Sequence, residues 1–218
     1  MSGMDSNFWD WLQRAAWAMA IVPEKRWAYL RIPKTGQTTV YRFMVQYKGK
    51  EKPLDLTENG GDYFRWLVRS MFSKAEWDTY ESWAMVRDPW DRAVSWWAYL
   101  FKDKIPFKEF IMSDLWKTSD YGVWIHGQPC SYFTHYNGEQ MVKNILRFEG
   151  FDEAATKIVQ SLGIADPCVS IQNNSQRGPY MEYYDDETKE KVSQMYRDDI
   201  ELFGYEFGKA KSATTRSF

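Results

Sequence analysis

With 218 residues the chain is long enough for one sizeable core, and we expect a single domain over residues 1–218. The formal net charge of −2 argues against broad binding of nucleic acid or of membrane surfaces, because both favour a basic excess. Its two cysteines, Cys130 and Cys168, form no CxxC zinc motif and favour a reducing compartment, while a disulfide between them stays open.

The first predicted element is an amphipathic helix over residues 8–22. One face of it carries the apolar side chains of Phe8, Trp11, Leu12, Ala15 and Met19. The segment is too short to span a bilayer and, with Asp10 and Arg14, too charged, and it lacks the layout of a signal peptide. We therefore expect a helix packed on the core, no membrane insertion and a cytoplasmic protein.

Three short apolar segments predict the strands of one sheet, at residues 27–32, 82–86 and 144–148. A helix is expected after each strand, at residues 38–46, 89–101 and 152–162. The other expectations are helices at 63–72, 74–80, 106–112 and 185–203, irregular chain at 48–62, 113–138 and 166–180, and a frayed tail at 209–218. Because strands and helices alternate, we predict an α/β fold of three layers, with a mainly parallel sheet flanked by helices. Ligands of such sheets bind beyond the carboxyl ends of the strands.

The first strand–helix junction, Pro33-Lys-Thr-Gly-Gln-Thr-Thr39, has anion-binding chemistry. It opens a helix whose unpaired backbone N–H groups and dipole favour a phosphate. Lys34 adds a positive charge, Gly36 allows close approach of the backbone, and the threonines add hydroxyl donors. The junction is not a Walker A loop, because that motif places its lysine after the second glycine, whereas Lys34 precedes Gly36.

The second junction has Arg87 at the end of a strand and Ser95 about two turns into the following helix. Asp88 is the expected N-cap of that helix. Two interpretations stay open here: a second phosphate site, or an ion pair of Arg87 with Asp88 or Asp91. Arg92 is interpreted as a structural or rim residue.

Together these motifs resemble the PAPS-dependent sulfotransferases, PAPS being 3′-phosphoadenosine 5′-phosphosulfate. The first looks like their 5′-phosphosulfate loop, and Val86-Arg-Asp-Pro with Ser95 looks like their 3′-phosphate motif. Further segments are similar to the carbohydrate-sulfotransferase branch: Phe107-Lys-Glu-Phe-Ile, Leu146-Arg-Phe-Glu149, Asn173-Asn-Ser-Gln-Arg177, Tyr183-Tyr-Asp185 and Asp199 to Tyr205. The resemblance covers about Arg31 to Phe207 and leaves residues 1–25 outside it. Gln37 departs from the family pattern, which usually has a second glycine there.

The resemblance implies a P-loop-like sulfotransferase fold and transfer of the sulfuryl group from PAPS, without a metal. The acceptor would be a hydroxyl, or less favourably an amine, on a small molecule or a saccharide. Lys34 would hold the bridging oxygen and stabilise the leaving bisphosphate, while Arg87 and Ser95 would hold the 3′-phosphate. Arg177 would close over the nucleotide from a late loop, or would be a solvated loop charge. The 5′-phosphate would be cradled by Thr35, Gly36, Gln37, Thr38 and Thr39.

Transfer to a hydroxyl needs a base near that hydroxyl. Asp62 is the candidate base, since Gly60-Gly61-Asp62 resembles a segment in which relatives carry Gly-His; a helix-capping role is its alternative. Glu58 is the reserve, and His126 is a third candidate. Two other functions stay open: a non-catalytic nucleotide-binding protein on the same fold, and a kinase-like phosphotransferase, which would need the Walker A loop that this sequence lacks.

Overall fold

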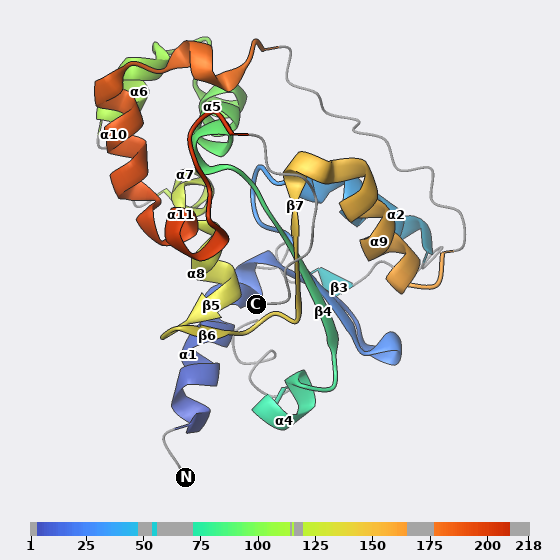
Figure 1. Ribbon diagram of the computed structural model, residues 1–218. Helices are drawn as coiled ribbons and strands as arrows, with labels where there is room; N and C mark the ends of the chain where they lie inside the picture. Colours follow the sequence, from blue (N-terminus) through green and yellow to red (C-terminus); the bar gives the residue numbers. More distant parts are fainter. Residues whose placement is uncertain are drawn as a thin grey trace.

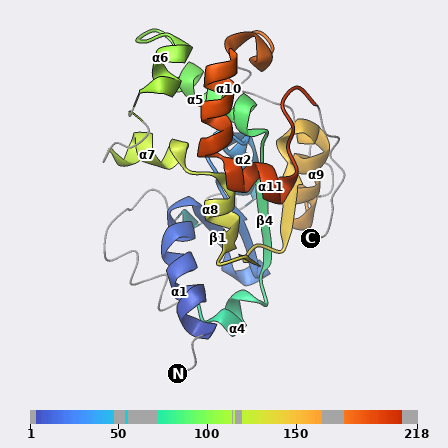
Figure 2. The ribbon, with the colours of Figure 1, turned by 60° about the vertical axis from the view of Figure 1, so that its left-hand side comes forward.

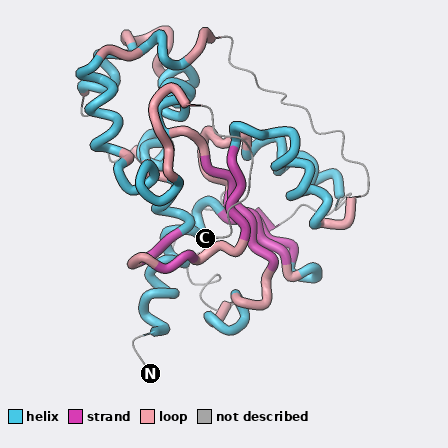
Figure 3. Tube along the Cα trace, in the orientation of Figure 1, coloured by secondary structure: helices cyan, strands magenta, loops and turns pink. Residues whose placement is uncertain are grey.

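A five-stranded sheet forms the middle layer of the computed structural model, which describes residues 4–47, 54–55, 72–113, 115, 120–164 and 177–209 (Figure 1, Figure 3). Its order is β3-β1-β2-β4-β7. The strands are β1 (Met19–Val22), β2 (Trp27–Leu30), β3 (Leu54–Asp55), β4 (Glu81–Val86) and β7 (Asn144–Arg147). β2, β4 and β7 are parallel, and β1 pairs antiparallel with both β2 and β3. The carboxyl ends of the three parallel strands therefore share one edge of the sheet.

Helices cover both faces of this sheet, and α2 and α9 lie together on one of them (Figure 1, Figure 2). The other side is covered by α1, α5 and several shorter helices, and a small ribbon of β5 (His135–Tyr136) and β6 (Glu139–Gln140) lies beside them. The helices are α1 (Met4–Ala15), α2 (Gln37–Tyr47), α4 (Lys74–Trp77), α5 (Pro89–Leu100), α6 (Phe107–Met112), α7 (Tyr121–Gly127), α8 (Cys130–Thr134), α9 (Phe151–Ser161), α10 (Asp186–Met195) and α11 (Arg197–Phe203).

Each face of the sheet has its own apolar core, because successive residues of a strand point to opposite faces. In β2, Trp27 and Tyr29 pack into the core under α2 and α9, whereas Ala28 and Leu30 pack into the core on the other side. Strands buried on both faces read as continuous apolar segments, which is the pattern of the predicted strands. The predicted three-layer α/β fold is confirmed.

The predicted strands and the helices after them are present with shifted ends, but the predicted helix at residues 8–22 is wrong in its last part. α1 ends at Ala15, and Met19–Val22 forms β1 beside β2. All four residues of β1 are completely buried, so an unbroken apolar segment fitted a helix face and a buried strand equally well. Pairing with β2 decides for the strand, because it satisfies the backbone of both segments.

Two further predictions are wrong in the second half of the chain. The predicted irregular segment at 113–138 contains α7, which Asp120 caps, as well as α8 and β5. The predicted helix at 185–203 is two helices, because the backbone of Tyr196 (φ −118°, ψ 31°) interrupts it between α10 and α11. The predicted irregular chain at 48–62 is described only at β3, and the predicted helix at 63–72 lies outside the described residues except for Phe72.

Candidate active site

In the loop after β2, two residues have backbone dihedral angles that a residue with a Cβ atom adopts only at an energetic cost. Lys34 has a positive φ of 68°, and Gly36 has a φ of 77°. Positive φ in a residue with a Cβ atom is uncommon and concentrates at functional sites. α2 begins at once after this turn, so its first backbone N–H groups, which have no acceptor within the helix, lie beside Lys34. This is the geometry of an anion site at a helix N-terminus.

Packing explains why a glycine stands at position 36. A Cβ atom placed there would lie 2.3 Å from Cε2 of Phe151 and 3.1 Å from Cε2 of Phe148. The two rings belong to the segment after β7, so the glycine lets the loop sit directly on α9 and the turn before it. The sequence predicted that Gly36 serves close approach of an anion, and the structure adds that close approach to aromatic rings also requires it.

Arg87 joins the second junction to this loop. Its Nη1 donates a hydrogen bond to the backbone carbonyl of Lys34 at 2.8 Å, and the ring of Phe148 lies 4.0 Å from its guanidinium carbon. Its Nε and Nη2 contact Oδ2 of Asp91 at 2.8 and 2.7 Å. The predicted ion pair of Arg87 with Asp91 is therefore present. Arg87 also lies beside the loop after β2, through its bond to the carbonyl of Lys34. Arg87 thus lies where both interpretations of this junction can hold.

Arg177 comes from the late segment and reaches the same carboxylate. Its Nη2 contacts Oδ1 of Asp91, and its side chain is only 8% exposed, so the interpretation as a solvated loop charge is wrong. The segment that carries it is fixed on the start of α5, because Tyr184 donates to the carbonyl of Trp90 at 2.9 Å. The three cations that the resemblance assigned to one nucleotide, Lys34, Arg87 and Arg177, therefore lie near one another.

Asp88 fixes the first turn of α5, as its predicted role as N-cap requires. Its Oδ1 accepts hydrogen bonds from the backbone N–H groups of Trp90 and Asp91 at 2.9 and 3.1 Å, and Tyr180 donates to its Oδ2 at 3.0 Å. Burial raises the pKa of Asp88 to about 6, although these hydrogen bonds oppose the shift. The backbone N–H of Asp88 in turn donates to Glu149 at 2.6 Å, which ties α5 to the end of β7.

Lys34 lies in a surrounding that weakens its hold on a proton. Burial, together with the positive charges of Arg87, Arg177 and Arg92, lowers its pKa to about 8. Its Nζ lies 4.0 Å from the ring centroid of Tyr99, a residue of α5 whose ring is largely exposed. An ammonium over an aromatic face is a favourable contact, so Tyr99 holds the side chain of Lys34 against α5.

His126 shares that tyrosine. Its ring stacks on Tyr99 with centroids 5.7 Å apart, and the same Tyr99 ring contacts Lys34. The sequence predicted His126 in an irregular aromatic segment, whereas the structure places it near the end of α7. Of the three candidate bases it is the one that the structure describes, since Asp62 and Glu58 lie outside the described residues. Tyr99 itself was missed, because an exposed tyrosine on a helix has no signal in the sequence.

Arg92 is a buried connector and not a rim residue. It is 1% exposed, its Nε donates to the carbonyl of Pro33 at 3.0 Å, and its Nη2 donates to the carbonyl of His126 at 3.1 Å. The structural interpretation of Arg92 is confirmed, since one guanidinium links the loop to α7. Its charge also interacts with the buried carboxylate of Asp199, which accepts hydrogen bonds from the backbone of α8 at 2.6 and 2.7 Å.

The other predicted donor-site residues lie in the same region with different exposures. Thr35 is completely buried, and its hydroxyl donates to the carbonyl of Ile32 at 2.8 Å. Oε1 of Gln37 accepts from Arg31 at 2.9 Å. Thr39 and Ser95 are 4% and 6% exposed. Of the two cysteines whose pairing was left open, Cys130 is a buried free thiol and Cys168 lies outside the described residues.

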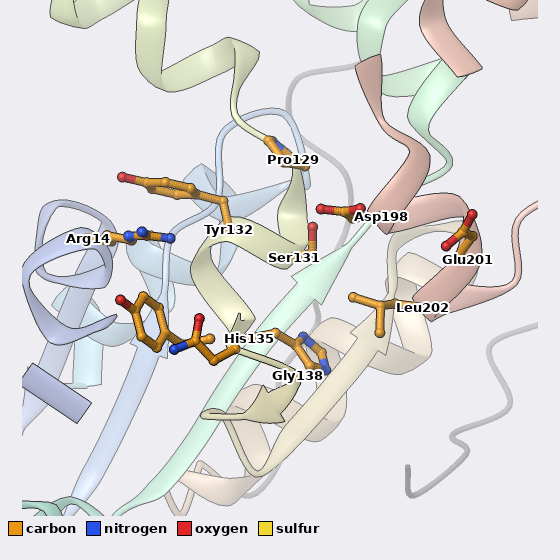
Figure 4. Close-up of a pocket in the computed structure, with 11 residues that line it drawn as sticks. Arg14, Pro129, Ser131, Tyr132, His135, Gly138, Asp198, Glu201 and Leu202 are labelled. Carbon is orange, nitrogen blue, oxygen red and sulfur yellow. The ribbon is translucent and has the colours of Figure 1, made fainter. Parts of the chain in front are cut away.

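A cleft of about 510 Å³ elsewhere in the described part of the chain shares no residue with this site (Figure 4). On one side of α8, the guanidinium of Arg14 lies over the rings of Tyr132 and Tyr136, 5.1 and 4.7 Å from their centroids. On the other side, α11 contributes the carboxylates of Asp198 and Glu201 (Figure 4). The walls of this cleft therefore carry opposite charges, in contrast to the three cations at the strand ends.

Within the part of the chain that the structure describes, no group of three or more His, Cys, Asp or Glu could hold a metal ion. None of the helices in these ranges has the length and apolarity to cross a bilayer. A family model described as "Sulfotransferase family" matches residues 17–206, which is most of the chain. No curated protein and no solved structure gives a significant match.

Proposed function

The chain belongs to the sulfotransferase family, and from this premise we propose that it moves the sulfuryl group of PAPS to a hydroxyl of a saccharide. One observation carries the choice of donor. The anion site after β2 and the arginine after β4 lie side by side, joined by the bond from Arg87 to the carbonyl of Lys34. PAPS carries phosphate groups on two separate carbons of its ribose, which suits two adjacent anion sites.

The residues present fit such a donor. Lys34, Arg87 and Arg177 supply three positive charges, and the N-terminus of α2 supplies backbone N–H groups. In the proposed roles, the loop and the start of α2 bind the 5′-phosphate, while Arg87, Ser95 and Arg177 bind the 3′-phosphate. An arginine fork gives a phosphate directional hydrogen bonds that a lysine cannot.

The proposed reaction is an in-line displacement at sulfur. The acceptor oxygen forms a bond to sulfur, the bond from sulfur to the bridging oxygen of the 5′-phosphate breaks, and adenosine 3′,5′-bisphosphate leaves. The acceptor proton goes to the base. Lys34 stabilises the charge that develops on the leaving oxygen, and because it is fixed beforehand little rearrangement is needed during the reaction.

Asp62 is the proposed base from the sequence, and His126 is the alternative that the contact with Tyr99 supports. Tyr99 contacts both Lys34 and the His126 ring, so the lysine and the imidazole share one neighbour. A cytoplasmic location stays part of the proposal, and the low cysteine content, which favours a reducing compartment, agrees with it.

The proposed function is tested by a transfer assay with sulfur-labelled PAPS, a panel of saccharides and a chelator. The wild-type protein should label at least one saccharide and release adenosine 3′,5′-bisphosphate, and Lys34→Ala should abolish both. Lys157→Ala is the control, because Lys157 is an exposed lysine of α9 that pairs with Glu153. Release of bisphosphate without labelled saccharide, or full labelling by Lys34→Ala, would contradict the proposal.

A further inference from the structure

We propose that Asp91 is a built-in competitor of the 3′-phosphate: its carboxylate holds the two arginines of the donor site in the empty protein and weakens their grip on the bisphosphate product. This inference rests on the proposed function, because it takes Arg87 and Arg177 as the ligands of the 3′-phosphate. It concerns the strength of that grip and the release of product.

The contacts of Asp91 occupy both arginines. Oδ2 accepts from Nε and Nη2 of Arg87, at 2.8 and 2.7 Å, and Oδ1 accepts from Nη2 of Arg177. The remaining terminal nitrogen of Arg87, Nη1, donates to the carbonyl of Lys34. Every nitrogen of Arg87 thus has a partner within the protein. A phosphate that binds Arg87 has to share it with the carboxylate or displace the carboxylate.

The charges explain why a carboxylate is useful in the empty protein. The side chains of Arg87 and Arg177 are 9% and 8% exposed, and both interact repulsively with Lys34. Buried like charges without a counter-ion are strongly unfavourable, so an anion among them stabilises the unliganded site. The two arginines in turn hold the pKa of Asp91 below its usual range, although burial alone would raise it. The carboxylate therefore stays ionised.

The same carboxylate acts against a bound phosphate. A dianionic 3′-phosphate within reach of both arginines lies close to Asp91, and like charges at such distances repel strongly in a partly buried site. A plain structural ion pair would need one arginine, whereas Asp91 contacts two that come from separate segments of the chain. The carboxylate of Asp91 thus lies between the two arginines, where the proposal puts the 3′-phosphate.

The test compares two nucleotides that differ only in the 3′-phosphate. Adenosine 3′,5′-bisphosphate and adenosine 5′-monophosphate are titrated by calorimetry into the wild type and into Asp91→Asn. We expect the variant to bind the bisphosphate about tenfold more tightly or better, with no change for the monophosphate. Asn keeps one acceptor oxygen, so one arginine retains its partner. Asp78→Asn is the matched control, because Asp78 is an exposed carboxylate that pairs with Lys74.

An unchanged or weaker affinity of Asp91→Asn for the bisphosphate would overturn the inference, since the carboxylate would then only orient the arginines. Asp91→Glu keeps the charge and should restore the wild-type affinity. If Asp91→Asn does not fold without ligand, the comparison is made with Asp91→Ser, to which the same two outcomes apply. A wild-type protein that binds both nucleotides equally would instead contradict the proposed function.

Discussion

Arg87 donates a hydrogen bond of 2.8 Å from Nη1 to the backbone carbonyl of Lys34, 53 residues earlier in the chain. The two residues meet because each follows a strand of the parallel pair β2 and β4, whose carboxyl ends lie next to each other. The bond fixes the carbonyl of a residue with positive φ and places two cations of the candidate site together.

Transfer should fall as the pH rises through about 8, because burial and the neighbouring arginines hold the pKa of Lys34 at about 8. Lysine is charged below its pKa and neutral above it, and only the charged form stabilises the leaving bisphosphate. This pKa of Lys34 applies to the protein without donor, so the decrease in rate at high pH, the basic limb, should appear in the pH profile of kcat/KM for the donor. Lys34→Arg should lose this limb, since a guanidinium stays charged. A limb that persists in Lys34→Arg would assign the titration to another group.

Gly36→Ala should destabilise the protein by about 2–4 kcal/mol, combining a strained positive φ with overpacking against Phe151. Gly138→Ala is the control, because Gly138 also has a positive φ but nothing within 4 Å of its Cβ position, so it should lose only about 1 kcal/mol. Urea denaturation measures both. Phe151→Leu should recover part of the loss in Gly36→Ala, and equal losses for the two alanine variants would show that the contact with Phe151 is unimportant.

The two strand–helix junctions were predictable because their signals are local. Asp88 as N-cap, each apolar strand and the glycine loop with its early lysine can each be recognised from a few consecutive residues. The sequence could not show contacts made across the chain. Arg177 reaches Asp91 only because the segment of residues 177–184 packs on α5. The sequence of β1 fits a helix as well as a strand, and its pairing with β2 makes it a strand.

Arg92→Met should lower the free energy of unfolding by about 3–5 kcal/mol, because it leaves two carbonyls unpaired and the buried Asp199 without its counter-charge. Arg92→Lys should lose less stability, since it keeps the charge. Lysine cannot bridge the carbonyls of Pro33 and His126 as the guanidinium does, so kcat should still fall in this variant. Stability from urea denaturation and kcat from the transfer assay check the two effects separately, and an unchanged kcat in Arg92→Lys would contradict a positioning role.

Asp62 and His126, two of the three candidate bases, can be separated by single substitutions. The variant that removes the base, Asp62→Asn or His126→Asn, should lose roughly 10²- to 10⁴-fold in kcat and keep its affinity for adenosine 3′,5′-bisphosphate. Turnover and calorimetric titration of the same preparations give both quantities. Unchanged turnover in Asp62→Asn removes Asp62 from the role, and unchanged turnover in His126→Asn does the same for His126.

The most direct test of the two adjacent anion sites is a metal-free calorimetric titration with adenosine 3′,5′-bisphosphate and with ADP. Both nucleotides carry two phosphate groups, but only the first carries them on two separate ribose carbons. A 3′-phosphate held by Arg87 and Arg177 should make the bisphosphate bind about a hundredfold more tightly than ADP. Equal affinities for the two nucleotides, or no binding of either, would contradict the account.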